Sequence, residues 1–309
     1  MGSFVTAFET VLPLFLVIIA GALFSRTKAS SEEWVEILNK YALWIGFPAL
    51  VIASLMQLEI GDKSYLTLIL VNSGYIIFAV LLAIPLSKIF GFSTQMKRTL
   101  FLILPFGNVA YLGIPVLQNA MGDEILPVAA IISAVYVFWL LTLAIILIEI
   151  YGDNKINSRK LLLSLAKNPL LISVFVGLAI VVFEIQLPEF AEKTITLFSD
   201  SVTAVVLFSL GIFLGMHHFG NLRRWMVVSG WTLVAMVVLP ALFWGSLQFL
   251  SFPNEQLKAS ILDSAMPMGL TPYALSIQYR LKTTLVARIV VLGTLLSMII
   301  IPLWLVILG

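Results

Sequence analysis

The chain has 309 residues, of which 61% are hydrophobic and only 11% are charged. Soluble globular domains carry roughly 25% charged residues, so this composition excludes an ordinary soluble protein and favours a membrane protein. The absence of cysteine excludes disulfide bonds and thiolate metal sites. The net charge of +2 is uninformative as a total, but the distribution of the charges along the chain carries information.

Ten apolar runs follow one another along the chain, and their lengths suit helices that cross a bilayer. They span residues 4–24, 34–56, 65–89, 97–119, 125–150, 167–184, 190–215, 224–250, 256–279 and 284–308. The first run has neither a basic leader nor a cleavage site, so we expect a mature helix there. The pattern predicts an all-α polytopic membrane protein with ten transmembrane helices.

The two halves of the chain resemble each other. At an offset of 156, the matching pairs are Pro13-Leu14 with Pro169-Leu170, Gly21 with Gly177, and Ser73-Gly74 with Ser229-Gly230. A polar stretch at residues 151–166 lies at the midpoint, whereas the other connections are short. We therefore predict a first five-helix repeat at residues 1–150, a cytoplasmic linker at 151–166, and a second five-helix repeat at 167–309.

Basic residues gather in the connections that follow the odd-numbered runs. Of the 18 lysines and arginines, 14 lie there, while the even-numbered connections are mostly acidic. By the positive-inside rule the odd connections are cytoplasmic, so both termini lie outside the cytoplasmic membrane. Because each half has an odd number of helices, the two repeats are inverted relative to the membrane.

Two apolar runs are interrupted by proline and glycine. The fourth run holds Pro105, Gly107, Gly113 and Pro115, and the ninth contains the segment Ser264-Ala-Met-Pro-Met-Gly-Leu-Thr-Pro272. In hydrocarbon, broken helical backbone is tolerated only where protein or a water-filled cavity covers it. Matched interruptions in two halves indicate a transporter binding site. The alternative is that these prolines only kink packed helices.

Three segments carry a family resemblance. They are Leu38-Asn-Lys-Tyr-Ala-Leu-Trp-Ile-Gly-Phe-Pro-Ala-Leu50, Gly107-Asn-Val-Ala-Tyr-Leu-Gly-Ile-Pro115 and Leu210-Gly-Ile-Phe-Leu-Gly215. The sequence resembles the auxin efflux carrier family in its short prokaryotic form. The resemblance implies a ten-helix inverted-repeat fold like that of bile-acid sodium symporters, with helices four and nine broken and crossed at the substrate site. Thr203 departs from the family, since many prokaryotic members have proline there, and this limits residue-by-residue transfer in the seventh run.

The candidate substrate-binding residues lie in the two interruptions. They are Gly107, Asn108, Gly113, Pro115, Thr271 and Pro272. We interpret Thr271-Pro272 as an N-cap followed by proline at the first helical position, and Pro115 as a similar restart. Each restart would aim free amides at the midplane, which suits a carboxylate. Asn108 offers two donors and one acceptor, and the alternative role for it is to satisfy freed carbonyls nearby.

Two carboxylates are candidates for ion coupling. Asp263 lies one turn before the second interruption, where a charge is costly unless it is paired or reached by water, and Asp200 lies in the seventh run. The alternative for Asp263 is a helix-end carboxylate reached by interfacial water. Asn39 and Lys40 are weaker candidates for substrate contact. The adjacent His217 and His218 cannot share a helix face, so we predict no metal site, and no catalytic residue is assigned.

The leading hypothesis is a secondary transporter of small organic anions that works by alternating access. The resemblance names malonate, malate and auxin-like weak acids as substrates. The third, fourth, fifth, eighth, ninth and tenth runs would form one bundle, and the first, second, sixth and seventh would form another that moves against it. No Walker A motif occurs, so ATP is not the direct energy source. No intramembrane protease motif occurs either, so we expect no enzyme. A channel or a membrane sensor remains open as an alternative.

We predict no cofactor, with H⁺ or Na⁺ left open as a coupling ion. The predicted partners are the anion and the lipid bilayer, and no nucleic acid. A homodimer is left open.

Overall fold

The computed structural model describes residues 2–56, 64–152, 159, 162–163, 166–216, 225–249 and 253–309. Within these ranges the chain is helical almost throughout, and the one β-type pairing is an isolated bridge between Gly107 and Met268. Seven of the described helices are long and apolar enough to cross a membrane, and two apolar helices, Val109–Met121 and Pro169–Val182, are shorter. The prediction of an all-α polytopic membrane protein is confirmed, whereas the number of ten crossings stays a prediction.

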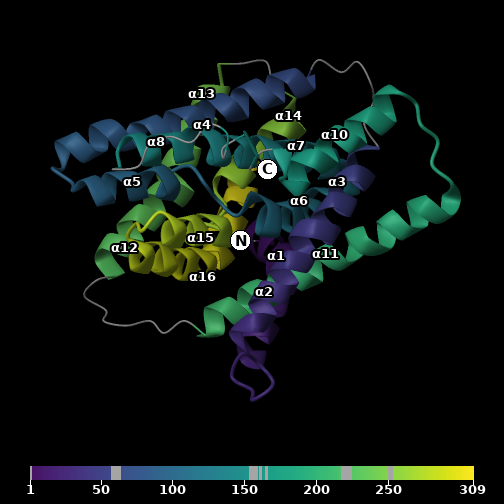
Figure 1. The fold of residues 1–309 in the computed structure, drawn as a ribbon, viewed down its shortest axis with the longest axis horizontal. Helices are drawn as coiled ribbons and strands as arrows, with labels where there is room; N and C mark the ends of the chain where they lie inside the picture. The colour runs from purple at the N-terminus through teal and green to yellow at the C-terminus, as the bar shows by residue number, and fades with distance from the viewer. Residues whose placement is uncertain are drawn as a thin grey trace.

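The described residues of the first half form a succession of helical elements, which Figure 1 draws from purple to teal. In order they are α1 (Gly2–Phe24), α2 (Glu32–Tyr41), the π-helical η1 (Ala42–Gly46), α3 (Phe47–Leu55), α4 (Ser64–Ile89), α5 (Thr94–Ile103), the π-helical η2 (Val109–Gly113), α6 (Ile114–Met121), the 3₁₀ turn η3 (Asp123–Ile125), α7 (Leu126–Trp139), the π-helical η4 (Leu140–Ala144) and α8 (Ile145–Ile150).

The second half begins with α10 (Pro169–Val182) and ends close to the C-terminus with α16 (Thr283–Leu308). Between them lie α11 (Glu189–Met216), α12 (Trp225–Leu233), the π-helical η6 (Val234–Val238), α13 (Leu239–Leu247), α14 (Asn254–Ser264) and α15 (Leu270–Gln278). Asn168 begins α10 by accepting a hydrogen bond from Leu171 N at 3.2 Å, with Pro169 at the first helical position. Most of the predicted linker lies outside the described residues, as do His217 and His218.

Proline accounts for most of the π-helical segments. Three of the four described here end two residues before a proline: η1 before Pro48, η2 before Pro115 and η6 before Pro240. Proline has no amide hydrogen, so the carbonyl four residues earlier loses its helical partner. At Pro240 that carbonyl belongs to Met236, and it accepts a hydrogen bond from Trp304 Nε1 at 3.0 Å instead. The membrane-embedded backbone is thus satisfied by a neighbouring helix.

Glycine lets α1 and α11 pack backbone to backbone. A Cβ atom on Gly21 would overlap the carbonyl oxygen of Phe208, and one on Gly211 would overlap that of Ile18. Small residues of this kind allow close helix approach where no hydrophobic effect drives association. Helices α2, α3 and α10 pack with this pair into one group. The other helices pack around α4, α7 and α16, and α1 also contacts α16 across the boundary between the groups.

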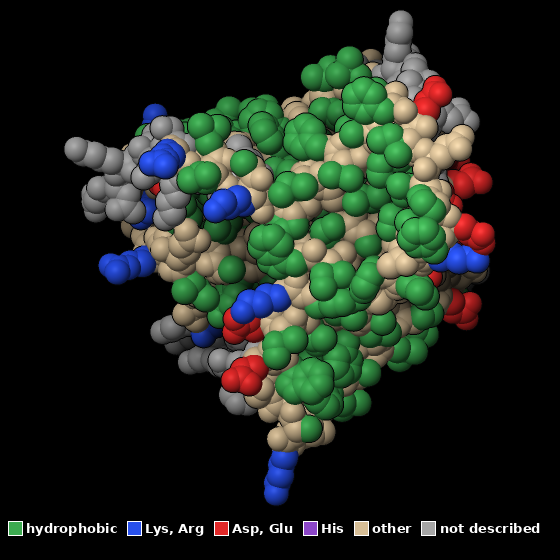
Figure 2. Space-filling model, turned by 45° about the vertical axis from the view of Figure 1, so that its right-hand side comes forward, with side chains coloured by type: hydrophobic (Ala, Val, Ile, Leu, Met, Phe, Trp, Pro, Cys, Tyr) green, Lys and Arg blue, Asp and Glu red, His purple; other side chains and the backbone are tan. Residues whose placement is uncertain are grey.

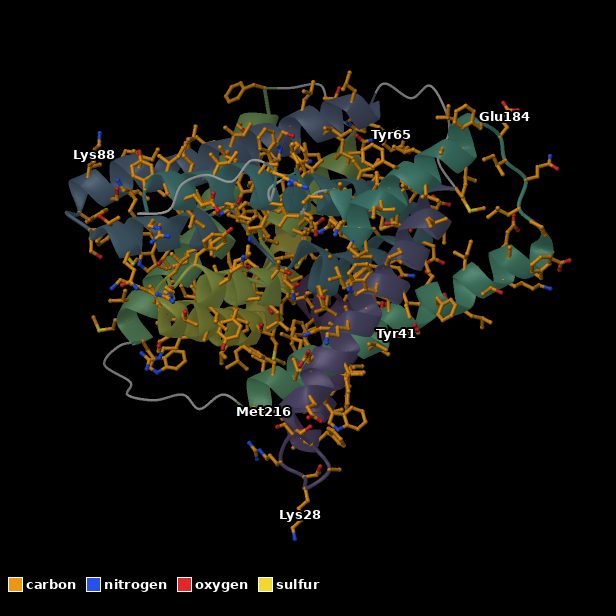
Figure 3. The ribbon with its side chains drawn as sticks, in the orientation of Figure 1. Lys28, Tyr41, Tyr65, Lys88, Glu184 and Met216 are labelled. Atoms are coloured by element: carbon orange, nitrogen blue, oxygen red, sulfur yellow. The ribbon has the colours of Figure 1, made fainter. Side chains whose placement is uncertain are left out.

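The surface separates charged side chains by sign. Figure 2 shows a broad face of hydrophobic side chains, with Lys and Arg gathered towards its left and lower edges and most Asp and Glu along the right edge. In Figure 3, Lys28 and Lys88 lie at the lower and left ends of the molecule, and Glu184 lies at the upper right. This arrangement suits a protein whose apolar belt crosses a bilayer between a basic and an acidic side.

Candidate functional site

Two helices are broken where the sequence places proline and glycine. Helix α5 ends at Ile103 and the chain is non-helical over residues 104–108 before η2 begins. Helix α14 ends at Ser264, and α15 begins only at Leu270. The predicted interruption of both apolar runs is therefore confirmed by the helix boundaries.

The two breaks pair with each other through their backbones. Asn108 N donates a hydrogen bond to Pro267 O at 2.6 Å, and Gly107 forms the isolated antiparallel bridge with Met268. Close approach requires glycine at this point, because a Cβ on Gly107 would lie 2.7 Å from Met266 O. The backbone groups freed by the breaks thus find partners in each other, as a low-dielectric surrounding demands.

The helices restart at positions other than those predicted from the prolines. The first restart is at Val109, where the carbonyl of Asn108 accepts from Leu112 N at 3.0 Å and Gly113 N at 2.9 Å. Pro115 therefore lies inside the restarted helix, and the prediction that it begins that helix is wrong. The bond from Gly113 spans five residues, and this π turn absorbs the proline that follows.

The second restart differs in its cap. Gly269 occupies the N-cap position in an extended conformation and α15 begins at Leu270, so Thr271 is the second helical residue and not the cap. Pro272 then falls in the first turn, where amide hydrogens have no helical partner and proline costs little. The prediction of a Thr271 N-cap is wrong, because the extended Gly269 already ends the non-helical segment.

A cavity of about 150 Å³ opens where the breaks meet. Residues of the two breaks and of the second restart line it: Phe106, Gly107, Asn108, Gly269, Thr271 and Pro272. The other walls come from η1 and α3, the η2 turn, α7 and η4, and the start of α10, including Leu43, Phe47, Tyr111, Tyr136, Val137, Asn168 and Leu170. The structure thus brings four of the six predicted substrate residues together, while Gly113 and Pro115 lie outside this lining.

The cavity offers donors within an apolar wall. Asn108 is buried, and the buried Tyr136 hydroxyl has no hydrogen-bond partner among the described residues. Three helix starts line the cavity, at η2, α15 and α10, through Asn108, Gly269 and Asn168 respectively. Helix N-termini present free amides and positive partial charge, so this arrangement suits a small anion. Sequence reasoning missed Tyr136 and Asn168, although Asn168-Pro169 is a recognisable helix-start signal.

Asp263 lies behind the cavity. Its side chain is fully buried, and neither carboxyl oxygen has a hydrogen-bond partner among the residues described. It packs against Gly113, where a Cβ atom would overlap Asp263 Oδ1. Nearby in α14, Ser260 Oγ accepts from Asn72 Nδ2 at 2.9 Å, which joins α14 to α4. An isolated charge in such surroundings is costly, so the buried carboxyl is a candidate functional group.

The sequence of this chain matches that of known membrane proteins. Residues 6–305 match the family model described as "Membrane transport protein". The chain belongs to this family, which includes the auxin efflux carriers. The predicted family resemblance is therefore confirmed.

Two relatives in this family match most of the chain, and a third matches about a third of it. An uncharacterized transporter of Methanocaldococcus jannaschii is 24% identical and covers 96% of this chain and 97% of its own length. A Rhizobium meliloti protein named "Putative malonate transporter" is 23% identical, with 93% of this chain and 91% of the relative covered. Auxin efflux carrier component 8 of Arabidopsis thaliana is 27% identical over 37% of this chain and 31% of its own.

Asp200 belongs to a different cavity of this family member. With Asp123, Asn119 and Thr203 it lines a polar cavity of about 380 Å³ between α1, α3, α6 and α11. Pro115 also lines this second cavity. The two candidate ion-coupling carboxylates, Asp200 and Asp263, therefore do not share a site.

Asn39 and Lys40 make contacts away from the cavity at the breaks. Asn39 Oδ1 accepts a hydrogen bond from Ser209 Oγ at 3.1 Å, which ties α2 to α11. Lys40 Nζ pairs with Glu36 at 2.6 Å, and both side chains are about two-thirds exposed, at 67% and 65%. Neither residue lines the cavity at the breaks, so the structure lends no support to the prediction that they contact the substrate.

Proposed function

We propose that this protein is a secondary transporter of small organic anions, either carboxylates such as malonate and malate or auxin-like weak acids. The observation that carries the proposal is the cavity between the two paired breaks, with Asn108 and three helix starts in its lining. Fixed amides and an asparagine side chain replace the hydration of a carboxylate without reorganisation. The name of the Rhizobium meliloti relative supports a dicarboxylate as the first substrate to test.

The substrate-binding residues in this proposal are Asn108, Gly107, Thr271 and Pro272, with Tyr136 added from the structure. Gly107 brings the backbones together, and Pro272 begins the second wall of the cavity. Gly113 and Pro115 act indirectly, by positioning the helix that follows Asn108. Asn108 is then the main donor to the anion.

Transport proceeds by alternating access in this proposal. Two walls of the cavity belong to the α1, α2, α3, α10 and α11 group, including Phe47 and Asn168, while the breaks belong to the other group. Because the substrate lies between the two groups, movement of one against the other changes its exposure. ATP plays no direct part.

The membrane arrangement proposed is ten crossings in two inverted five-helix repeats, with the broken fourth and ninth helices crossed at the site. The sorting of basic and acidic side chains supports cytoplasmic odd-numbered connections and external termini in the cytoplasmic membrane. A C-terminal fusion to a fluorescent protein that folds only in the cytoplasm tests this. We expect no fluorescence, and a fluorescent fusion would overturn the sidedness.

Asp263 is the proposed ion-coupling residue, with H⁺ or Na⁺ as the ion. A carboxyl that gains a proton or binds Na⁺ loses its net charge, and this lowers the cost of burying it behind the breaks. Asp200 is the second candidate, because it lines the polar cavity between the helix groups.

The test of function is uptake into proteoliposomes of labelled mono- and dicarboxylates, with imposed Na⁺ or pH gradients. We expect saturable uptake of at least one acid, accelerated by unlabelled acid trapped inside. Counterflow of this kind distinguishes a carrier from a channel. Uptake that does not saturate and shows no counterflow would favour a channel, and no uptake of any carboxylate would overturn the proposed substrate class.

A further inference from the structure

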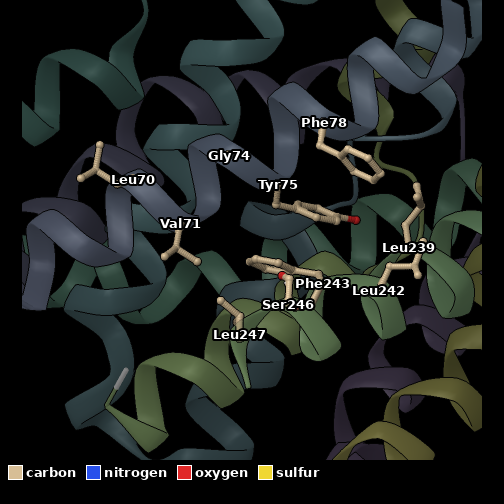
Figure 4. A pocket seen from close by; sticks show the side chains of 10 residues that line it. All are labelled: Leu70, Val71, Gly74, Tyr75, Phe78, Leu239, Leu242, Phe243, Ser246 and Leu247. Atoms are coloured by element: carbon tan, nitrogen blue, oxygen red, sulfur yellow. Dashed lines mark hydrogen bonds between the residues drawn. The ribbon is translucent and has the colours of Figure 1, made fainter. Parts of the chain in front are cut away.

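A groove of about 630 Å³ runs between α4 and α13, away from the cavity at the breaks. Its lining is apolar apart from one serine and one tyrosine hydroxyl: Leu70, Val71, Gly74, Tyr75, Phe78, Leu239, Leu242, Phe243, Ser246 and Leu247. Figure 4 shows Tyr75 and Phe243 at its centre, Leu70 and Val71 at one end, and Phe78, Leu239 and Leu242 at the other. Its dimensions exceed those of the cavity at the breaks.

The groove is continuous with the face that the protein turns to the bilayer. The side chains at its rim, Leu70, Phe78 and Leu242, are 63%, 51% and 55% exposed. Both flanking helices belong to spans long and apolar enough to cross a membrane, Tyr65–Ile89 and Trp225–Leu247. Hydrocarbon surrounds the apolar part of such spans, so an alkyl chain is the ligand that an apolar groove between them suits.

The groove offers few polar groups. Ser246 Oγ already donates to Phe243 O at 2.7 Å, and the Tyr75 hydroxyl lies beside the Ser264 side chain. An alkyl chain needs no polar partner, so the groove suits it better than a polar ligand. Gly74 leaves extra room, because a Cβ atom at that position would meet nothing within 4 Å.

The floor of the groove leads to the cavity at the breaks. The rings of Tyr75 and Phe243 are stacked with centroids 4.4 Å apart and form that floor. On its other side, Tyr75 contacts Ser264, the last residue of α14 before the break, and its ring centre lies 6.5 Å from that of Tyr136. Tyr136 in turn lines the cavity.

We propose that the groove binds one acyl chain of a bilayer phospholipid, and that the bound chain holds Tyr75 against Ser264 and Tyr136 and so steadies the cavity at the breaks. When the chain leaves, the side of the buried Tyr75–Phe243 pair that lines the groove loses its packing. The tyrosine pair and the second break then become more mobile, and the cavity opens more often.

Photolabelling tests the binding. The purified protein is reconstituted in phosphatidylethanolamine–phosphatidylglycerol vesicles that contain a phosphatidylcholine with a diazirine on one acyl chain, and labelled peptides are mapped by mass spectrometry. We expect labels to concentrate at residues 70–78 and 239–247. Gly74→Phe fills the groove with protein atoms and should reduce that labelling about tenfold, the factor that corresponds to about 1.4 kcal/mol of lost binding.

The matched control is Gly230→Phe on α12. Gly230 is exposed, a Cβ there also meets nothing within 4 Å, and it does not line the groove. Its substitution should leave groove labelling unchanged. Labelling of the wild-type groove no stronger than that of α12 would overturn the proposal, and this comparison does not depend on either variant folding.

The coupling to the cavity is tested with a single cysteine, because the natural chain has none. Thr271→Cys places a thiol in the cavity wall, and its rate of reaction with a maleimide is measured in delipidated protein with and without added phosphatidylglycerol. We expect added lipid to slow labelling about threefold, or about 0.65 kcal/mol, and Gly74→Phe to slow it without lipid. Equal rates with and without lipid would overturn the coupling.

Discussion

Both broken helices stop and restart near the cavity, but they restart in different ways and carry different side chains. The first break restarts through a π turn capped by the Asn108 carbonyl and exposes the Asn108 side chain to the cavity. The second restarts after an extended Gly269, with no side-chain cap, and its preceding helix carries the buried Asp263. The two breaks thus differ in chemistry, with a polar amide at the cavity in one and, behind it in the other, a carboxyl that has no hydrogen-bond partner among the described residues.

The difference shows which features a crossing of this kind needs and which it leaves free. The first break needs glycine at the contact, since Gly107 abuts Met266 O. At the second break a Cβ on Gly269 would lie 3.1 Å from Asn108 Oδ1, so the Asn108 side chain would have to shift. The form of the restart is free, because one break restarts through a π turn and the other through an extended glycine. The side chains that flank the contact are then available for function.

The largest effect is expected at Gly107, the residue that makes the backbone contact. Gly107→Ala places a Cβ against Met266 O, which is a backbone atom and cannot move by a change of side-chain rotamer. The free energy of unfolding should therefore fall by about 3 kcal/mol. Thermal unfolding in detergent measures this. The control is Gly74→Ala in α4, where space is open and alanine should raise stability by up to about 1 kcal/mol. Equal melting temperatures for the two variants would mean that the breaks do not need close approach.

Asn108 distinguishes the first break from the second, and its removal should affect binding more than folding. Asn108→Ala removes a hydrogen bond to a charged group, at a cost of about 1.5–3 kcal/mol, or ten- to a hundredfold in affinity. Affinity for the transported acid and melting temperature are measured on the same sample. If Asn108 instead bridges freed carbonyls, the melting temperature falls and the affinity stays.

Gly113 joins the first break to the carboxyl of the second. Gly113→Ala pushes a Cβ into Asp263 Oδ1 and should lower the free energy of unfolding by about 2 kcal/mol. The double variant Gly113→Ala with Asp263→Ala removes the obstructing oxygen, so the two changes should couple by about 1 kcal/mol. Strictly additive changes in denaturation free energy would show that the two side chains do not interact.

Loss of the Asp263 carboxyl should weaken the coupling of transport to an ion gradient and change the stability of the fold little. Asp263→Asn keeps the volume but removes the titratable carboxyl, so gradient-driven uptake in proteoliposomes should fall about tenfold, the loss of about 1.4 kcal/mol of coupling, while exchange persists. Asp200→Asn is the comparison, since that residue lies in the other cavity. If neither variant changes coupling, transport is uncoupled or the ion binds backbone carbonyls.

Thr271, in the second restart, should show the smallest effect. It lines the cavity but does not cap α15, so Thr271→Val removes one neutral hydroxyl at nearly constant volume. Affinity for the acid should fall about threefold or less, in line with a net hydrogen bond of about 0.5–1 kcal/mol. A loss as large as that of Asn108→Ala would place the main donor in the second break.

Much of the site was predictable because proline and glycine act locally. Pro105 and Pro267 lie within the breaks, where their missing amide hydrogens remove helical hydrogen bonds and neighbouring glycines lower helix propensity further. Proline alone does not decide this, because Pro13, Pro85 and Pro302 lie inside continuous helices. The same local argument failed for Pro115 and for Thr271. Pro115 is absorbed by a π turn, and the cap of α15 is Gly269, so the exact restart depends on how the two breaks pair.

The sequence by itself determined that this protein lies in a membrane, that two apolar segments are broken, and to which family the chain belongs, because composition, missing amides and short motifs are properties of the chain alone. Only the tertiary structure decided that Tyr136 and Asn168 line one cavity with Asn108 and that Asp200 lines another. It also decided that Asn39 accepts a hydrogen bond from Ser209. The physical reason is that these neighbours are brought together by side-chain packing between helices far apart in sequence, and no local pattern records which helix faces which.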